Sequence, residues 1–309
     1  MSMAPNAVIF AMANPDPEIT PEEVHEVRSI NADFVYSVPH IPAPGETLAS
    51  TNRQVFLGGK GANMSVAAAR AAARVNHIGA VGEDGRWAVA RLLEYGVDTT
   101  HIAEIDVETA QAIIVVDESG ENSIVLYQGA NVAVPQKSLE QALTRAKTGD
   151  TFVFQNETNL QMEGAKLARE MGLKVAFAAA PFDSDVVQSV LPHLDFLILN
   201  EVEAEQLKSA SGQGPADFPV KDVIVTLGSD GATWFGPDGE ANIAAHKVTP
   251  VDTTGAGDTF TGYVLACLDR GQPMLQALQT ASKAAALMVT RRGTADVIPD
   301  LKDVQDFSG

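Results

Sequence analysis

The chain is poor in cysteine, in basic residues and in long apolar runs, and each shortage excludes a class of protein. Its single cysteine, Cys267, excludes a disulfide framework within the chain and is typical of a reducing compartment. Lys plus Arg number 21 against 40 Asp plus Glu, which gives a formal net charge of −19. Such a charge repels nucleic acids and anionic membranes, and no apolar run is long enough to span a bilayer. We therefore predict a cytoplasmic protein without nucleic-acid or membrane partners.

The first 28 residues differ in character from the rest of the sequence. Residues 8–13 have the pattern of a strand, and Thr20-Pro21-Glu22-Glu23 carries residues that start helices. Residues 5–19 resemble a segment of the nucleotide-binding domain of malic enzymes, but nothing downstream continues that resemblance. We interpret residues 1–28 as an atypical N-terminal leader and residues 29–309 as the folded domain.

From residue 29 onward, short apolar segments alternate with helical patterns. We expect strands at residues 75–81, 151–155, 175–179 and 196–199, a hairpin of residues 112–116 and 123–127, and helices at residues 86–95, 135–147 and 160–171. Buried strands separated by helices predict a three-layer α/β/α fold around a mostly parallel sheet. In such sheets, ligands bind beyond the carboxyl ends of the strands.

The segment Asp252-Thr253-Thr254-Gly255-Ala256-Gly257-Asp258 lies between a β-like run at residues 245–251 and a helical pattern at residues 259–268. Its small residues allow a ligand close to the backbone, and the start of the helix directs unpaired N–H groups towards a phosphate. Asp258 would repel that phosphate, so it serves either as a helix cap or as a base for an attacking nucleophile. The local sequence alone favours the cap.

A second glycine-rich segment, Gly58-Gly59-Lys60-Gly61-Ala62-Asn63, opens an alanine-rich helix. Its glycines indicate a close approach of backbone, but the pattern matches neither a Walker loop nor the Gly-x-Gly-x-x-Gly dinucleotide fingerprint. Lys60 and Asn63 are one helical turn apart, which would let both contact one polyhydroxylated ligand. A glycine-rich connection with a solvated lysine is the alternative.

Other polar residues follow predicted strands, namely Asn31, Asp33, Glu157, Asn200, Glu203 and the segment 226–231. Asn31 and Asp33 are two residues apart and would share one side of a strand end, with an Asx turn as the alternative. Asn200 and Glu203, taken alone, indicate a helix-capping pair rather than a metal site. Residues 226–231 alone indicate a turn.

In their order along the chain, these motifs resemble the ribokinase branch of the carbohydrate kinases, which are related to the minor phosphofructokinases, over about residues 29–300. The resemblance implies an ATP-dependent kinase that phosphorylates the primary hydroxyl of D-ribose. Kinases of the same family that act on fructose, a ketodeoxy sugar acid or a nucleoside are the alternative. A non-catalytic sugar or nucleotide sensor is an alternative of another class. A dinucleotide-dependent oxidoreductase, suggested by the leader, lacks the glycine fingerprint.

The resemblance also implies a role for each motif. Asp258 becomes the general base, which reverses the local preference for a cap, and the N–H groups of Gly255, Ala256 and Gly257 hold the charge of the transferred phosphoryl group. The implied sugar contacts are Asn31, Asp33, Gly59, Lys60, Asn63 and Glu157. The implied ATP contacts are Asn200, Thr226, Gly228 and Gly231. Arg28-Ser29 stands where the family usually has Gly-Ser.

Metal ions and a partner subunit are implied in the same way. Glu203 would bind Mg²⁺ through water. A monovalent cation, K⁺, would be bound by the Asp252 side chain and by the carbonyls of Thr254, Met288, Arg291 and Gly293. Val297 stands where ribokinases often have a serine that completes this site. Segments 33–52 and 108–128 match a small β-sheet lid, through which we expect a homodimer.

Overall fold

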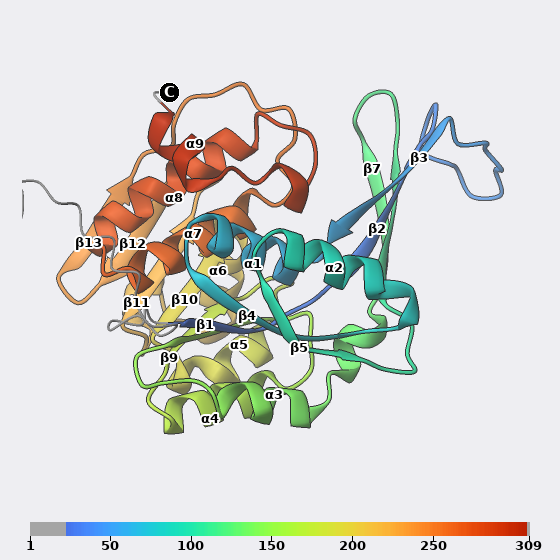
Figure 1. Cartoon of the computed structure of the whole chain (residues 1–309). Helices are drawn as coiled ribbons and strands as arrows, with labels where there is room; N and C mark the ends of the chain where they lie inside the picture. The colour runs from blue at the N-terminus through green and yellow to red at the C-terminus, as the bar shows by residue number, and fades with distance from the viewer. Residues whose placement is uncertain (1–22, 308–309) are drawn as a thin grey trace, which may run out of the picture.

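The computed structural model describes residues 23–307, so the predicted strand at residues 8–13 and the segment 5–19 lie outside the described residues. The large sheet is built from β1 (Glu23–Val27), β4 (Arg74–Val81), β5 (Asp98–Glu104), β8 (Thr151–Gln155), β9 (Lys174–Ala178), β10 (Phe196–Asn200), β11 (Asp222–Thr226), β12 (Ala232–Gly236) and β13 (Gly239–Ile243). These nine strands are ordered β13-β12-β11-β10-β9-β8-β1-β4-β5 (Figure 1). All strands from β5 across to β11 run parallel, while β12 and β13 are antiparallel to their neighbours. The predicted mostly parallel sheet is confirmed.

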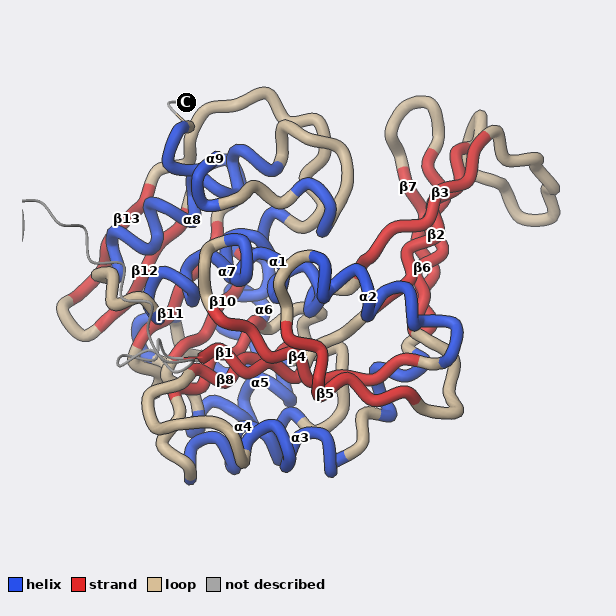
Figure 2. The backbone as a smooth tube through the Cα atoms, viewed as in Figure 1, coloured by secondary structure: helices blue, strands red, loops and turns tan. Residues whose placement is uncertain are grey.

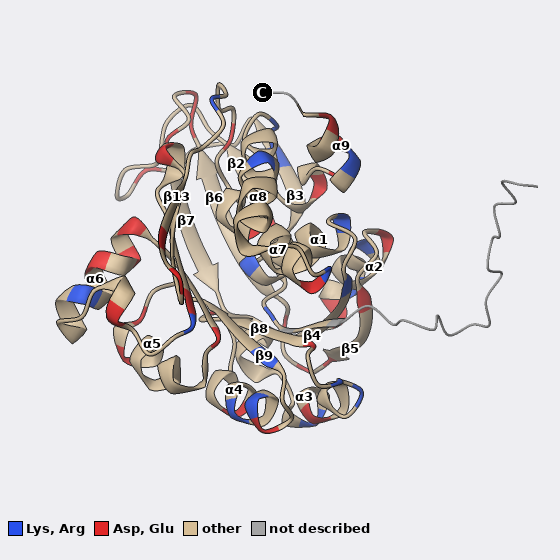
Figure 3. Ribbon diagram, turned by 90° about the vertical axis from the view of Figure 1, so that its left-hand side faces the viewer, with Lys and Arg blue, Asp and Glu red and all other residues tan. Residues whose placement is uncertain are grey.

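Helices cover both faces of this sheet (Figures 2 and 3). One face carries α1 (Lys60–Arg70), α2 (Arg86–Glu94), α7 (Ala256–Asp269) and α8 (Met274–Met288), with α9 (Leu301–Asp306) packed on α8. The other carries α3 (Gln136–Leu143), α4 (Gln161–Glu170), α5 (Ser184–Val190) and α6 (Glu201–Ser211). The ribbon of α6 carries several positions coloured as Asp or Glu (Figure 3), in keeping with the net negative charge. Among the described residues, no helix is long and apolar enough to cross a membrane.

Strand β8 shows how the two faces obtain their cores. Phe152 and Phe154 are fully buried against α3 and α4, whereas Val153 between them is fully buried in the cluster of α1 and α7. Successive side chains of a strand point to opposite faces, so a strand covered on both sides is apolar at every position. Each such burial contributes about 2 kcal/mol.

Strand β1 corrects the predicted leader boundary. Residues 23–27 lie in the interior of the sheet, where β1 pairs with β4 on one side and with β8 on the other. Val24 and Val27 are buried on opposite faces. His25 and Arg28 are also buried, and these polar residues hid the apolar pattern. Residues 23–28 thus belong to the folded domain, and Glu23 begins a strand rather than a helix.

The strand predicted at residues 245–251 is wrong. No regular element follows β13 until α7 begins at Ala256. The N–H groups of Val251 and Asp252 both donate to the carbonyl of Val289 at the end of α8, at 2.7 and 3.1 Å. These two bonds run to a helix end and not to a neighbouring strand, so the segment pairs within no sheet.

A smaller sheet stands apart from the body of the molecule (Figure 1). Its order is β3-β2-β6-β7, with β2 (Asn31–Ser37), β3 (Asn52–Gly58), β6 (Ala110–Val116) and β7 (Asn122–Tyr127). The predicted hairpin is confirmed as β6 and β7, which pair antiparallel. The small sheet joins the body where β1 passes into β2, so Asn31 and Asp33 lie at the junction.

Candidate active site

The start of α7 depends on a glycine and faces open space. Gly255 precedes the helix with φ 77°, a left-handed conformation that other residues rarely adopt. A Cβ on Gly255 would lie 2.9 Å from Cε of Met288, whereas a Cβ on Gly257 would meet nothing within 4 Å. The N–H group of Ala256 donates to the carbonyl of Thr253 at 3.3 Å. The space beside Gly257 is unfilled, as an anion cradle at this helix start requires.

Asp258 is buried in the first turn of α7 but does not cap the helix. No side chain makes a capping hydrogen bond at this terminus. Oδ2 of Asp258 instead accepts a hydrogen bond of 2.9 Å from Nδ2 of Asn63 in α1. Burial raises the pKa of Asp258, while Lys60 and the Asn63 hydrogen bond act in the opposite direction. The helix cap that the local sequence favours for Asp258 is therefore not formed, because its side chain bonds across to α1.

The glycine-rich loop before α1 approaches other backbone segments of the chain very closely. Gly59 has φ 92°, and a Cβ there would lie 3.0 Å from the carbonyl oxygen of Ser29 and from the backbone nitrogen of Asn31. A Cβ on Gly61 would lie 2.4 Å from the nitrogen of Ser29. The predicted close approach is thus made to the connection between β1 and β2. It brings Lys60 and Asn63 beside Asn31.

Lys60 lies among three carboxylates. Its pKa is raised chiefly by the charge of Asp258, against the effect of burial, and further by Glu157 and Glu203. Its backbone N–H donates to Oε2 of Glu157 at 3.2 Å. Burial raises the pKa of Glu157, which the hydrogen bond from Ser29 and the charge of Lys60 partly offset. Side chains from α1, α6, α7 and the end of β8 therefore share one electrostatic environment, with a lysine on one helix facing three acidic groups.

Asn31 and Asp33 both belong to β2, so the alternative of an Asx turn is wrong. The carboxylate of Asp33 lies where a side chain on Gly58 would be, since a Cβ there would be 1.9 Å from Oδ2. Burial, and then the charge of Glu157, raise the pKa of Asp33 to about 7. Asp33 is thus a carboxyl group that changes its charge near neutral pH.

Asn200 and Glu203 form a reciprocal capping box at the start of α6, as the local sequence predicts. Oδ1 of Asn200 accepts the N–H of Glu203 at 2.8 Å, and Oε2 of Glu203 accepts the N–H of Asn200 at 2.8 Å. Burial raises the pKa of Glu203. Within residues 23–307, no three His, Cys, Asp or Glu side chains cluster as metal ligands.

Thr226 is the last residue of β11, and Gly228 and Gly231 follow it, where a short 3₁₀ turn stands in place of the predicted plain turn. Asn200 and Thr226 are directly opposite in the parallel pair of β10 and β11. Gly231 has φ 102°, and a Cβ there would lie 1.9 Å from the carbonyl oxygen of Ile243. The predicted nucleotide contacts therefore meet at the carboxyl ends of adjacent strands.

Asp252 joins two loops beside the start of α7. Its Oδ1 accepts the N–H of Thr254 at 3.0 Å, and its Oδ2 accepts the N–H of Gly293 at 3.3 Å. The carbonyl of Met288 accepts the N–H of Arg291 at 2.9 Å. Asp252 therefore links the loop before α7 to the loop after α8, and these two segments carry the predicted cation ligands.

Sequence reasoning missed two buried residues that hold this site together. The hydroxyl of Ser29 accepts the N–H of Gly61 at 3.0 Å and donates to Oε2 of Glu157. Asn131 bonds to both Ile30 and Asn31. The sequence did contain a hint of the role of Asn131, because Gly129-Ala130-Asn131 has the same sequence as residues 61–63. Ser29 carried none beyond its place before Asn31.

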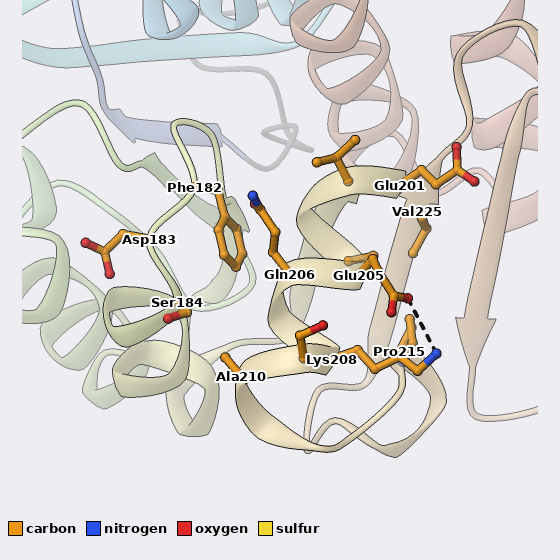
Figure 4. A pocket seen from close by; sticks show the side chains of 13 residues that line it. Phe182, Asp183, Ser184, Glu201, Glu205, Gln206, Lys208, Ala210, Pro215 and Val225 are labelled. Carbon is orange, nitrogen blue, oxygen red and sulfur yellow. Dashed lines mark hydrogen bonds and ion pairs between the residues drawn. The ribbon is translucent and has the colours of Figure 1, made fainter.

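A separate cavity of about 1140 Å³ lies beside α5 and α6 (Figure 4). It is lined by Phe182, Asp183, Ser184, Glu201, Val202, Ala204, Glu205, Gln206, Lys208, Ser209, Ala210, Pro215 and Val225. None of the predicted site residues lines it. Glu205 and Lys208 form an exposed ion pair of 3.4 Å at its edge. The converging groups at the starts of α1 and α7 therefore define the candidate site.

Comparisons with known proteins agree with this geometry. The model of the pfkB family of carbohydrate kinases matches residues 23–301. A ribokinase of Haemophilus influenzae is 36% identical over 294 residues, which cover 90% of this chain and 96% of that protein. The crystal structure of a Cryptococcus neoformans ribokinase with ADP has a TM-score of 0.81 at 31% identity, covering 92% of this chain and 99% of the other. An Arabidopsis thaliana ribokinase complexed with ribose and ATP has a TM-score of 0.82 at 27% identity, with coverages of 94% and 100%.

Proposed function

Since the chain belongs to the pfkB family of carbohydrate kinases, we propose that it transfers the γ-phosphate of ATP to the primary hydroxyl of D-ribose. The predicted family, fold class and sugar kinase activity are confirmed. Ribose as the acceptor is supported by relatives named ribokinase and by the similarity to a structure containing ribose and ATP. The observation that carries the proposal is the buried carboxylate of Asp258, held at the open start of α7 by Asn63.

We assign the role of general base to Asp258. Its carboxylate would take the proton of the sugar hydroxyl as that oxygen attacks the γ-phosphate. Burial raises the pKa of Asp258, which makes the carboxylate a stronger base, while Lys60 and Asn63 favour its ionised form. The Asp258 carboxylate can therefore be a stronger base than an exposed aspartate and still be ionised before the reaction.

The phosphoryl group would lie against the first turn of α7. The transition state of phosphoryl transfer is loose, so positioned donors and charges do most of the catalysis. The N–H groups of Gly255, Ala256 and Gly257 would hold its oxygens. Lys60 adds a positive charge among Asp258, Glu157 and Glu203, which reduces the repulsion of an incoming polyphosphate.

The sugar would lie between β2 and α1. Oδ1 of Asp33 and Oδ1 of Asn63 are buried acceptors without a hydrogen-bond partner among residues 23–307. Such atoms are costly to leave unpaired, and sugar hydroxyls would donate to both. We assign Asn31, Gly59, Lys60 and Glu157 to the sugar site as well.

The nucleotide would bind where β10 and β11 end, with Asn200, Thr226, Gly228 and Gly231 as contacts. The capping box uses Oε2 of Glu203 and leaves Oε1 available, which fits a Mg²⁺ ion held through water. Mg²⁺ would neutralise charge on the phosphates.

We assign a K⁺ site to the loops that Asp252 joins. The carboxylate would face the cation, with the carbonyls of Thr254, Met288, Arg291 and Gly293 as further ligands. Hard cations prefer such oxygen sets. Val297 lies beside Gly293, where its methyl groups supply no oxygen.

The small sheet would act as a lid over the sugar and as the contact surface of a homodimer. Ile124, Val125, Leu126 and Tyr127 of β7 are all large and exposed. An exposed apolar strand at the edge of a sheet is stabilised when another subunit covers it. The single Cys267, free and buried, fits a cytoplasmic enzyme.

A ribose-dependent ADP-release assay tests the acceptor. The purified protein is supplied with ATP, Mg²⁺ and K⁺ and with a panel of ribose, 2-deoxyribose, fructose, a ketodeoxy sugar acid and nucleosides. We expect the highest kcat/KM with ribose. Release no faster than without sugar would overturn the ribose assignment, and binding of sugar and nucleotide without turnover of any acceptor would favour the sensor.

A further inference from the structure

The side-chain amide of Asn131 is bonded at both ends and has a fixed orientation. Asn131 is 3% exposed and lies in the 3₁₀ turn Gly129–Ala133. Its Oδ1 accepts the backbone N–H of Ile30 at 3.0 Å, and its Nδ2 donates to Oδ1 of Asn31 at 2.8 Å. A backbone N–H only donates, so the atom facing Ile30 has to be oxygen. The NH₂ group of Asn131 is thereby directed at Asn31.

This bond also fixes the amide of Asn31. Its oxygen is taken by Asn131, so the hydrogens of its own NH₂ group point to the other side. Within the described residues, Nδ2 of Asn31 has no hydrogen-bond partner, although Asn31 is only 7% exposed. The backbone N–H of Ile30 thus fixes the orientation of the Asn131 amide, which in turn fixes that of the Asn31 amide. The NH₂ group of Asn31 therefore faces the site as a hydrogen-bond donor.

The donor at Asn31 complements the acceptors around it. Asp33, two residues further on β2, is a carboxyl group whose pKa is raised by burial and then by the negative charge of Glu157. A sugar hydroxyl both donates and accepts, so one between Asn31 and Asp33 would accept from the amide and donate to the carboxylate. If the Asn31 amide were turned the other way, it would present its oxygen beside the two carboxylate oxygens of Asp33, and the sugar hydroxyl would meet acceptors only.

We propose that Asn131 is a positioning residue that holds Asn31 as a hydrogen-bond donor to the sugar. The proposal rests on the assignment of Asn31 to the sugar site. The alternative is a purely structural role, in which Asn131 connects the β1–β2 junction to the turn at residues 129–133. In that case, substitutions of Asn131 would affect folding, and the orientation of the Asn31 amide would not matter for sugar binding.

The variant Asn131→Asp separates the two roles. Its carboxylate still accepts the N–H of Ile30 but no longer donates to Asn31, whose amide then turns round and presents oxygen to the sugar. We expect the KM for ribose to rise on the order of tenfold, which is the loss of one hydrogen bond, while the KM for ATP stays unchanged and kcat falls less than the ribose KM rises. A ribose KM equal to that of the wild type would overturn the proposal.

Asn159→Asp is the matched control. The Asn159 side chain also bridges a backbone N–H and a carbonyl, both of Val134, at 3.0 and 2.9 Å, and within the described residues it bonds to no predicted sugar residue. The backbone N–H of Asn159 donates to the carbonyl of Asn131 at 3.4 Å, and the substitution keeps that bond. We expect this variant to keep the ribose KM of the wild type. An equal rise in both variants would show that any buried carboxylate in this region disturbs the site, and would overturn the specific role of Asn131.

A second comparison serves if Asn131→Asp fails to fold. In Asn31→Asp the side chain has oxygen at both ends, so its orientation no longer matters. Adding Asn131→Ala to that background should leave the ribose KM nearly unchanged, although Asn131→Ala alone raises it. If the increases in ribose KM caused by Asn31→Asp and by Asn131→Ala multiply in the double variant, Asn131 has only a structural role, and the proposal is overturned. A wild-type protein that does not phosphorylate ribose refutes the proposed acceptor instead, and the same variants are then compared on the panel sugar that is turned over.

Discussion

The amide of Asn63 donates to the carboxylate of Asp258 over 2.9 Å, although the two residues are 195 positions apart. This bond joins the two glycine-rich segments, because Asn63 lies in the first turn of α1 and Asp258 in the first turn of α7. Both helices start at a glycine with positive φ, Gly59 and Gly255. The site is therefore built at the facing ends of two helices, and the base is aimed by a residue from the other helix.

Asp258→Asn should abolish turnover while binding persists. The substitution keeps the shape of the side chain but removes the group that accepts the proton, and general base catalysis contributes on the order of 10²–10⁴ in rate. Steady-state kinetics should show kcat reduced by this factor, and calorimetry should show ribose and ATP affinities within a few-fold of the wild type. A variant with near-normal kcat would refute the role of Asp258.

Asn63→Ala should shift the pH dependence of the reaction. The hydrogen bond from Asn63 lowers the pKa of Asp258, so its loss leaves burial less opposed and raises that pKa further. A higher pKa means that Asp258 becomes protonated at a higher pH, and the acidic limb of the kcat profile should move upward. We also expect kcat to fall on the order of tenfold. Reduced activity with an unmoved acidic limb would indicate general disruption rather than control of the base.

Asp33 should make ribose binding sensitive to pH near neutrality. Its pKa is raised to about 7, chiefly by burial, so the carboxylate gains a proton as the pH falls through that value and loses acceptor capacity. The KM for ribose should therefore rise on the acidic side of pH 7. The variant Asp33→Asn carries an amide that cannot titrate, and its KM should be high and free of this limb.

The same group should lower stability at alkaline pH. The native state holds a proton that the unfolded chain releases above pH 3.8, so stability falls as the pH rises from there to about 7 and stays low beyond it. Asp33→Asn removes this penalty, and its Tm should exceed that of the wild type above pH 7 and converge with it in acid. A Tm difference independent of pH would contradict the buried, shifted carboxyl group.

Gly58→Ala should impair sugar binding through Asp33. The added Cβ would lie 1.9 Å from Oδ2 of Asp33, so the carboxylate has to move. We expect the ribose KM to rise on the order of tenfold, the loss of one hydrogen bond, with a smaller change in kcat. Gly214→Ala is the control, because its Cβ would lie an ordinary 3.5 Å from Asp217. Equal kinetics in both variants would contradict the role of Gly58.

Most of the framework was predictable from the sequence because its strands are buried on both faces. The run at residues 151–155 is buried at every position and has the apolar residues Phe152, Val153 and Phe154 at its centre, and a short apolar run of this kind between helical patterns is typical of a strand inside a parallel sheet. Two predictions were wrong because the amino-acid composition of the segment did not match its actual strand pairing. Residues 245–251 look like a strand but bond to the end of α8, and β1 lies in the sheet interior while carrying buried His25 and Arg28.

Many residues of the candidate site were predictable from the sequence, but the hydrogen bonds between them were less so. The carboxyl ends of parallel strands gather polar residues, so Asn200 and Thr226 were expected together. The local pattern also identified the capping box of Asn200 and Glu203. The partner of Asp258 was not predictable, since a hydrogen bond between distant helices leaves no periodic signal. Ser29 and Asn131 were missed for the same reason.

Two variants of Asp252 should separate a structural role from a role in cation binding. The carboxylate accepts the N–H groups of Thr254 and Gly293 and so joins the loop before Gly255 to the loop after α8. Asp252→Asn keeps one acceptor oxygen but loses the charge that would attract K⁺, so its activity should no longer depend on K⁺. Asp252→Ala also releases the loop, and its kcat should fall on the order of tenfold further. Val297→Ser supplies the missing hydroxyl beside Gly293 and should increase the stimulation by K⁺ over Na⁺. The measurement is ribose-dependent ADP release in matched chloride salts, and equal stimulation in the wild type and Asp252→Asn would refute the cation site.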